Sequence, residues 1–318
     1  MTRTCLSVLL SCGSLLLNPV WVYAQTYPVK PVRIVAAGSA GGGGDFVARV
    51  LAAGLSPGLG QPVVVDNRPA VIATETVAKA PPDGYTILVF SNSLWMASFL
   101  EDVTYDPVRD FSPIAVSNRA PNILVVHPSI PAKSVKELIS IAKAKPGTLD
   151  YATAETGGSA HLAGELFKAM AGVNIVRIPY KSTTPALTEL IAGQVHMMFG
   201  NASVAPAIKS GRLRALAVST AEPSALYPGL PTVAAAGLPG FESSSIHVVF
   251  APAKTPAAVI SRLNQEIAKT LATADVKEKF ANFGAETVGG TPDILAATMK
   301  SEMARVGKLV KDAGLRAN

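Results

Sequence analysis

Short apolar segments alternate with helical patterns along the chain from residue 32 onward. The apolar segments are rich in Val and Ile and lack a clean polar alternation, which is typical of strands buried on both faces of a sheet. We predict such strands at 32–36, 62–66, 85–90, 123–126, 175–179 and 213–219.

The segments between these strands carry helix signals. Ser134 and Glu137 have the spacing of a capping box, in which each side chain bonds a free backbone N–H group at the helix start. Thr-Pro pairs at 255–256 and 291–292 fit a helix cap followed by a first-turn proline. Apolar residues then recur at helical spacing, which indicates core contacts, at Ile260, Leu263, Ile267 and Leu271 and again at Leu295, Met299, Met303, Val306 and Val310.

Strand–helix alternation predicts an α/β fold, doubly wound, with mainly parallel sheets. The 318-residue chain suits two such domains better than one. No repeat or low-complexity linker marks a boundary, so we place the crossings between domains near His127 and Ile246. Domain 1 then takes 25–127 and 246–318, and domain 2 takes 128–245.

The N-terminus has the order of a secretory signal peptide. Arg3 is followed by an apolar stretch and by the cleavage pattern Val22-Tyr23-Ala24, so we expect residues 1–24 to be removed and the mature protein to reach the periplasm. A lipid anchor at Cys12 is the alternative, although the apolar residues continue past it to Val22, which favours cleavage after Ala24. Both cysteines, Cys5 and Cys12, lie in this segment, which excludes disulfides and cysteine-based sites from the mature chain.

Charge changes this picture little. Lys and Arg number 28 against 22 Asp and Glu, a net charge of +6, and they are scattered without the basic stripe of a nucleic-acid-binding protein. The excess either attracts an anionic solute or belongs to an ordinary solvated surface, and charge alone does not decide between these.

The most unusual segment is the glycine-rich stretch at 36–45, between a predicted strand and a predicted helix. Gly41, Gly42, Gly43 and Gly44 remove side chains here, so that backbone N–H groups and the positive end of the helix can approach an anion. The glycines match neither the P-loop nor the GxGxxG frame of nucleotide sites. The alternative is a flexible loop with Asp45 as the helix N-cap.

Three further polar loops follow strands. Residues 151–161 run through glycines into a helix with Ser159 as its expected N-cap, and His161 in its first turn either bonds a ligand or is structural. Residues 179–185 carry hydroxyls before another helix, and 199–203 contain Asn201. Because ligands of α/β sheets bind at strand ends, four such loops together indicate a binding site.

No catalytic or metal site is legible, and we expect no cofactor. The four histidines, His127, His161, His196 and His247, lie far apart without HxxxH or HExxH spacing, and no GxSxG turn is present. An exported hydrolase or lyase that uses His161 stays the competing hypothesis.

Ten ordered segments of the chain resemble the Bug-type extracytoplasmic solute-binding receptors of tripartite tricarboxylate transporters. They lie at 27–35, 66–69, 77–86, 105–111, 158–162, 178–181, 211–218, 230–232, 251–256 and 311–314, and together span nearly the whole mature chain. The resemblance implies a type II periplasmic-binding-protein fold, with two domains that close on a ligand cleft between them. Its implied ligands are small organic acids or amino acids held by backbone N–H groups and bridging waters.

Carried over by position, the family's ligand contacts fall on all four loops. They are Gly41, Gly42, Gly43 and Gly44 in the first loop, Thr153, Gly158, Ser159 and His161 in the second, Tyr180 and Thr183 in the third, and Asn201 in the fourth. The resemblance implies a monomer that delivers its solute to membrane permease subunits, or that presents it to a sensor kinase.

Two segments depart from the family pattern. The stretch 36–44 lacks the prolines of the usual first loop and is longer by one residue, and 70–76 replaces a glycine-rich stretch that contacts ligand in the family. We expect the second change to make the pocket wall more apolar, so citrate-like specificity is not assumed.

Overall fold

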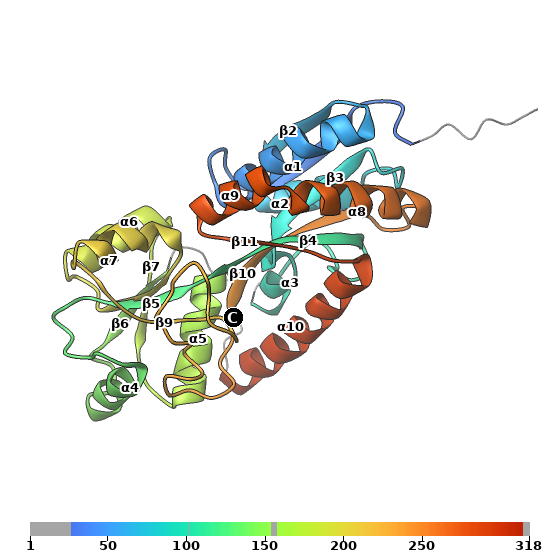
Figure 1. Ribbon diagram of the computed structural model, residues 1–318. Helices are drawn as coiled ribbons and strands as arrows, with labels where there is room; N and C mark the ends of the chain where they lie inside the picture. Colours follow the sequence, from blue (N-terminus) through green and yellow to red (C-terminus); the bar gives the residue numbers. More distant parts are fainter. Residues whose placement is uncertain (1–26, 101, 154–157, 314–318) are drawn as a thin grey trace, which may run out of the picture.

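The strands of this protein form two separate sheets, each with helices on both faces (Figure 1). The computed structural model describes residues 27–100, 102–153 and 158–313. The predicted signal peptide and the two cysteines lie outside the described residues.

The larger sheet has six strands in the order β11-β4-β10-β3-β1-β2. These strands are β1 (Val32–Ala37), β2 (Val63–Arg68), β3 (Thr86–Ser91), β4 (Phe111–Pro121), β10 (Ser244–Pro252) and β11 (Glu286–Gly289). Its helices are α1 (Gly43–Leu59), α2 (Ala70–Ala78), α3 (Ser93–Met96), the short 3₁₀ helix η1 (Ala97–Phe99), α8 (Ala257–Ala272), α9 (Ala274–Phe283) and α10 (Pro292–Ala313). We call this unit the six-stranded lobe.

The smaller sheet has five strands in the order β7-β6-β8-β5-β9. These are β5 (Ile123–Val126), β6 (Asp150–Thr153), β7 (Val176–Pro179), β8 (Met197–Gly200) and β9 (Arg214–Val218). Its helices are α4 (Val135–Ala144), α5 (Ser159–Ala171), α6 (Thr183–Ile191), the 3₁₀ helix η2 (Ala202–Val204) and α7 (Ala205–Lys209). We call this unit the five-stranded lobe.

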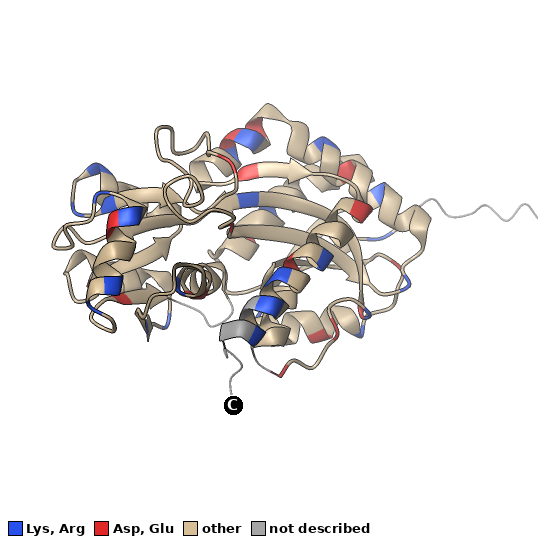
Figure 2. Cartoon of the chain, turned by 90° about the horizontal axis from the view of Figure 1, so that it is seen from below, with Lys and Arg blue, Asp and Glu red and all other residues tan. Residues whose placement is uncertain are grey.

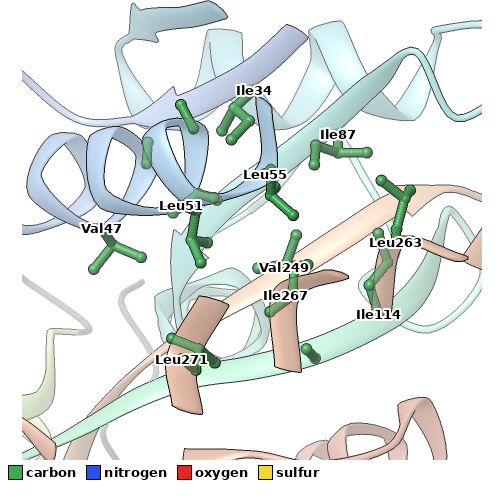
Figure 3. Close-up of a cluster of buried hydrophobic side chains, with 14 of the residues drawn as sticks. Ile34, Val47, Leu51, Leu55, Ile87, Ile114, Val249, Leu263, Ile267 and Leu271 are labelled. Carbon is green, nitrogen blue, oxygen red and sulfur yellow. The ribbon is translucent and has the colours of Figure 1, made fainter. Parts of the chain in front are cut away.

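Alternating strand residues divide the six-stranded lobe into two apolar layers. Side chains two apart in a strand point to the same face, so Ile34, Ile87 and Val249 pack under α1 and α8 (Figure 3). Their neighbours Val35 and Leu88 point the other way, towards α2, α3 and α10. The predicted helical stripes of α8 and α10 belong to these layers, which confirms their interpretation as core contacts.

The chain passes between the lobes twice. It leaves β4 at Pro121 and enters β5 at Ile123, and it returns after β9 at Val218 to begin β10 at Ser244. We propose that each sheet with its helices is one domain, which places the crossings at Asn122 and between Val218 and Ser244, a few residues before the predicted boundaries at 127/128 and 245/246. Lys and Arg are scattered over both lobes among Asp and Glu (Figure 2).

The predicted α/β class is confirmed, but the sheets are mixed rather than mainly parallel. Strand β10 runs antiparallel to both of its neighbours, and β5 runs antiparallel to β8 and β9. The missed strand β4 carries the polar run Ser117, Asn118 and Arg119, and therefore has no continuous apolar segment to mark it.

Several helices begin one or two residues away from the predicted cap. Helix α1 begins at Gly43 with Gly42 as N-cap, so Asp45 lies inside the first turn, and α5 begins at Ser159 with Gly158 as N-cap. Thr255 does not cap α8, because its hydroxyl donates to the Pro252 carbonyl at 2.8 Å and the helix starts at Ala257. Among the described residues, no helix combines the length and apolar character needed to span a membrane.

Candidate functional site

The carboxyl ends of the parallel strands in both sheets lie at the edges where the chain crosses between lobes. In the six-stranded sheet, Ala37 pairs with Arg68, and Ser91 lies opposite His247 near the start of β10. In the five-stranded sheet, Thr153 pairs with Pro179, and Gly200 lies opposite Ile123. The two crossings join these edges, so the four predicted loops lie on facing edges of the lobes (Figure 1).

The first loop is closed by a carboxylate of its own helix. The N–H of Gly41 donates to Asp45 Oδ2 at 2.8 Å, and the N–H of Gly42 donates to the Ser39 carbonyl at 3.0 Å. Arg49 pairs with Asp45 Oδ1 at 2.8 Å, and this bond is the main reason that the pKa of the Asp45 carboxyl is below its usual range. The N–H groups of Gly43 and Gly44 lie in the first turn, where no helical carbonyl precedes them. Of the four glycines, these two are therefore placed to meet an anion.

Glycine at 44 is required by space. A Cβ there would lie 2.7 Å from the Ala37 carbonyl oxygen, a distance that no ordinary side chain tolerates. The glycine-rich loop is thus a close approach of α1 to the end of β1 rather than a merely flexible connection.

Two residues beside this loop were missed by the sequence analysis. A Cβ at Gly43 would lie 3.1 Å from His247 Nε2 on β10, and His247 Nδ1 lies 3.4 Å from Asn118 Nδ2 on β4. Burial lowers the pKa of His247 to about 4, so the ring is neutral at pH 7. Neither β4 nor β10 was predicted as a strand, and no spacing in the sequence joins residues 118 and 247.

The second and third loops lie side by side. The Thr153 carbonyl accepts the Tyr180 N–H at 2.8 Å, and the Thr153 hydroxyl accepts from Arg177 Nε at 3.0 Å. His161 is buried, and burial, followed by the nearby Arg177 charge, lowers its pKa to about 4. Thr183 is the first residue of α6. Residues 154–157 of the second loop lie outside the described residues.

The fourth loop contacts the six-stranded lobe directly. Asn201 Oδ1 accepts the Ser203 N–H at 3.0 Å and caps η2. A Cβ at Gly284, just after α9, would lie 2.1 Å from Ala202 Cβ. The adjacent Phe283 stacks on Phe46 of α1 with ring centroids 4.1 Å apart, so the first and fourth loops are linked through the end of α9.

Among the described residues, no group of three or more His, Cys, Asp or Glu side chains is arranged to hold a metal ion. The polar groups at the facing edges include backbone N–H groups, hydroxyls, amides and a neutral imidazole, together with the Arg177 guanidinium bonded to Thr153 and the Asp45–Arg49 pair. Such a set binds by hydrogen bonding and helix-end fields, and suits an anion with several acceptor oxygens.

The family model described as tripartite tricarboxylate transporter family receptor (TctC) matches residues 47–315. The chain belongs to this receptor family. It is a family of solute-binding receptors, not of enzymes. A solved structure of the periplasmic binding protein BugD is 33% identical, with a TM-score of 0.77, and the match covers 92% of this chain and 100% of that one. The Bug-type resemblance and the type II binding-protein fold are therefore confirmed.

Two similar receptors were solved with a dicarboxylate. R. palustris Rpa4515 with adipate is 39% identical, with a TM-score of 0.79, and the match covers 91% of this chain and 98% of that one. MatC (Rpa3494) from Rhodopseudomonas palustris with bound malate is 30% identical, with a TM-score of 0.76, over 89% of this chain and 100% of that one.

In this receptor the segment that follows β2 is a helix. Helix α2 begins at Ala70, directly after its N-cap Pro69, so 70–76 is helical. Val71 and Ile72 in its first turn are 58% and 48% exposed, so the surface at this helix start is apolar, and its part in a pocket wall stays a prediction.

The crossings of the receptor are held by buried hydroxyl and amide bonds. The Asn122 N–H donates to Ser219 Oγ at 2.9 Å, and Ser219 Oγ donates in turn to the Ser243 carbonyl. Ser159 Oγ donates to Asn122 Oδ1 at 3.3 Å, so the start of α5 is tied to the first crossing. A pocket of about 20 Å³ beside Ser159 has room for a water molecule but not for an organic acid.

Proposed function

We propose that this receptor captures a small organic acid with two carboxylates between its lobes. The observation that carries the proposal is the placement of helix starts on the facing edges. Helix α1 begins at the edge of the six-stranded lobe, and α5 and α6 begin at the opposite edge of the five-stranded lobe. Each helix start offers unpaired N–H groups and a partial positive charge, so the two edges suit the two ends of a dianion.

Further support comes from the relatives. Rpa4515 was solved with adipate and MatC with malate, and both are dicarboxylates. The proposed contacts are the N–H groups of Gly43 and Gly44 on one lobe and the loops at Gly158–Ser159, Tyr180–Thr183 and Asn201 on the other.

Capture would proceed by hinge closure about the two crossings, and the closed form would deliver its solute to membrane permease subunits. The signal-peptide pattern at 1–24 supports a periplasmic receptor that meets both solute and permease outside the inner membrane.

A thermal-shift screen tests the proposal. The purified protein is unfolded and refolded to remove bound solute, and then mixed with adipate, with malate and with their dimethyl esters. A dicarboxylate at about a hundred times its Kd stabilises the fold by about 2.7 kcal/mol, which raises Tm by a few degrees, whereas the uncharged esters give no shift.

A matched pair of variants places the site. Asn201→Trp fills the fourth loop and abolishes the shift, whereas Asn174→Trp, on an exposed loop before β7 at the opposite edge, retains it. Equal shifts with acids and esters, or a shift that survives Asn201→Trp, would contradict the proposal.

A further inference from the structure

The strand pair β4–β10 presents a histidine to the start of α1, and an irregularity of the sheet sets its position. The pairing of the two strands shifts register between His247 and Val248, because His247 lies opposite Asn118 while Val248 lies opposite Val116. Ser117 is the extra residue of this bulge. Bulges re-aim side chains next to binding sites, and here two neighbouring polar residues stand close to His247.

The contact with Asn118 is the basis on which we assign the tautomer of His247. The amide nitrogen of Asn can donate a hydrogen bond but cannot accept one. Asn118 Nδ2 therefore donates to His247 Nδ1, which lies 3.4 Å away. A neutral imidazole with an accepting Nδ1 carries its hydrogen on Nε2. Nε2 is the atom that lies 3.1 Å from the Cβ position of Gly43, and it therefore stands beside the first turn of α1.

The surroundings of this donor are buried and incompletely bonded. Asn118 and Ser117 are fully buried, and Asn118 Oδ1 and Ser117 Oγ have no hydrogen-bond partner among the described residues. Buried polar atoms are rarely left in this state, so the side of β4 that faces His247 is polar and not saturated by hydrogen bonds within the protein.

We infer that His247 is a specificity-determining residue of this receptor, held by Asn118 in the tautomer that donates Nε2–H to the solute carboxylate at the start of α1. The inference rests on the proposed function and adds a side-chain donor to the backbone N–H groups of Gly43 and Gly44. Since the ring is neutral, it recognises the carboxylate by the direction of one hydrogen bond. A charged ring would instead attract every anion alike.

Two substitutions at His247 separate the hydrogen bond from the shape of the ring. Gln places an amide N–H near the position of Nε2, whereas Phe keeps a ring and removes the donor. By calorimetry with adipate or malate, His247→Phe weakens binding by roughly 10- to 100-fold, as expected for a lost hydrogen bond to a charged group. His247→Gln restores most of the affinity. His127→Phe, at the far end of β5, is the control and leaves Kd unchanged.

The tautomer is measured without any ligand. ¹⁵N chemical shifts of the histidine-labelled protein show His247 with its hydrogen on Nε2 at pH 7. A hydrogen on Nδ1, or a His247→Phe protein that binds within twofold of the unmodified protein, overturns the inference and leaves the proposed function standing. Failure of the unmodified protein to bind any dicarboxylate overturns both.

Discussion

Gly284 and Ala202 meet across the two lobes. Gly284 ends α9 in the left-handed conformation, with φ of +80°, and a Cβ there would lie 2.1 Å from Ala202 Cβ. The contact joins the end of α9 in the six-stranded lobe to the fourth loop of the five-stranded lobe, at a place where no side chain can be added without moving the lobes apart.

Gly284→Ala is therefore expected to weaken solute binding. The added methyl group opposes closure, and we expect Kd for a dicarboxylate to rise about tenfold, which corresponds to about 1.4 kcal/mol. Gly60→Ala is the matched control, because Gly60 also ends a helix with φ of +67° but has nothing within 4 Å of its Cβ position. Both variants lose Tm from left-handed strain, and only Gly284→Ala changes Kd by calorimetry. Equal affinity of the two variants would show that the contact does not limit closure.

Loss of the Asp45 carboxylate should open the first loop. Asp45→Ala removes the acceptor of the Gly41 N–H and leaves Arg49 unpaired, and we expect a loss of about 1–2 kcal/mol in the free energy of unfolding, measured with urea. Arg49→Ala is the control, since its side chain is 60% exposed and an exposed ion pair contributes at most about 1 kcal/mol. If Arg49→Ala destabilises the protein as much as Asp45→Ala, the loop bond contributes nothing of its own.

The crossing between β9 and β10 depends on one buried hydroxyl. Ser219→Ala leaves the Asn122 N–H and the Ser243 carbonyl without their partner, and a buried unpaired group costs about 1–3 kcal/mol. The neighbouring Thr220→Ala removes an exposed hydroxyl bonded to the Glu222 carbonyl, and should change the free energy of unfolding little. Urea unfolding of both variants compares them, and similar stabilities would argue against a structural role for Ser219 at the crossing.

Acid should destabilise the protein partly through His161. Its pKa is about 4 in the folded protein and ordinarily 6.5, so the unfolded chain binds a proton first as the pH falls. The stabilising contribution is complete above pH 6.5 and is lost as the pH falls towards 4. At pH 5 the loss is roughly 2 kcal/mol. Between pH 7 and pH 5, the free energy of unfolding of His161→Gln should fall by about 2 kcal/mol less than that of the unmodified protein. His247 is present in both proteins and contributes equally to each. Parallel pH curves would contradict this.

The strands β1 and β3 could be predicted because they are apolar and buried on both faces, whereas β2 and β7, predicted in the same way, are half-buried or exposed. Val35 and Leu88 are as buried as Ile34 and Ile87, so β1 and β3 read as unbroken apolar segments. The long antiparallel strands β4 and β10 were not predicted because polar residues interrupt their apolar sequence near the site, at 117–119 in β4 and at Ser244, Ser245 and His247 in β10. His247 and Asn118 were missed as neighbours because their contact depends on the register between these two unpredicted strands.

The four loops were predicted correctly as neighbours of strand ends, but the chemistry of single residues was not. Gly42 and Gly158 cap α1 and α5 with an extended backbone and without a side chain, which no hydroxyl pattern reveals. The alternative in which Asp45 caps the helix is wrong, because Gly42 is the N-cap and Asp45, from inside the helix, accepts the Gly41 N–H. The roles of Thr153, His161, Tyr180, Thr183 and Asn201 as ligand contacts stay predictions.

Isothermal titration calorimetry of the solute-free protein with adipate and with malate tests the central claim most directly. We predict saturable one-to-one binding of at least one of these dicarboxylates, no heat from the matching dimethyl ester, and loss of that binding in Asn201→Trp. The absence of saturable binding to either acid by a folded protein would contradict a dicarboxylate site between the lobes.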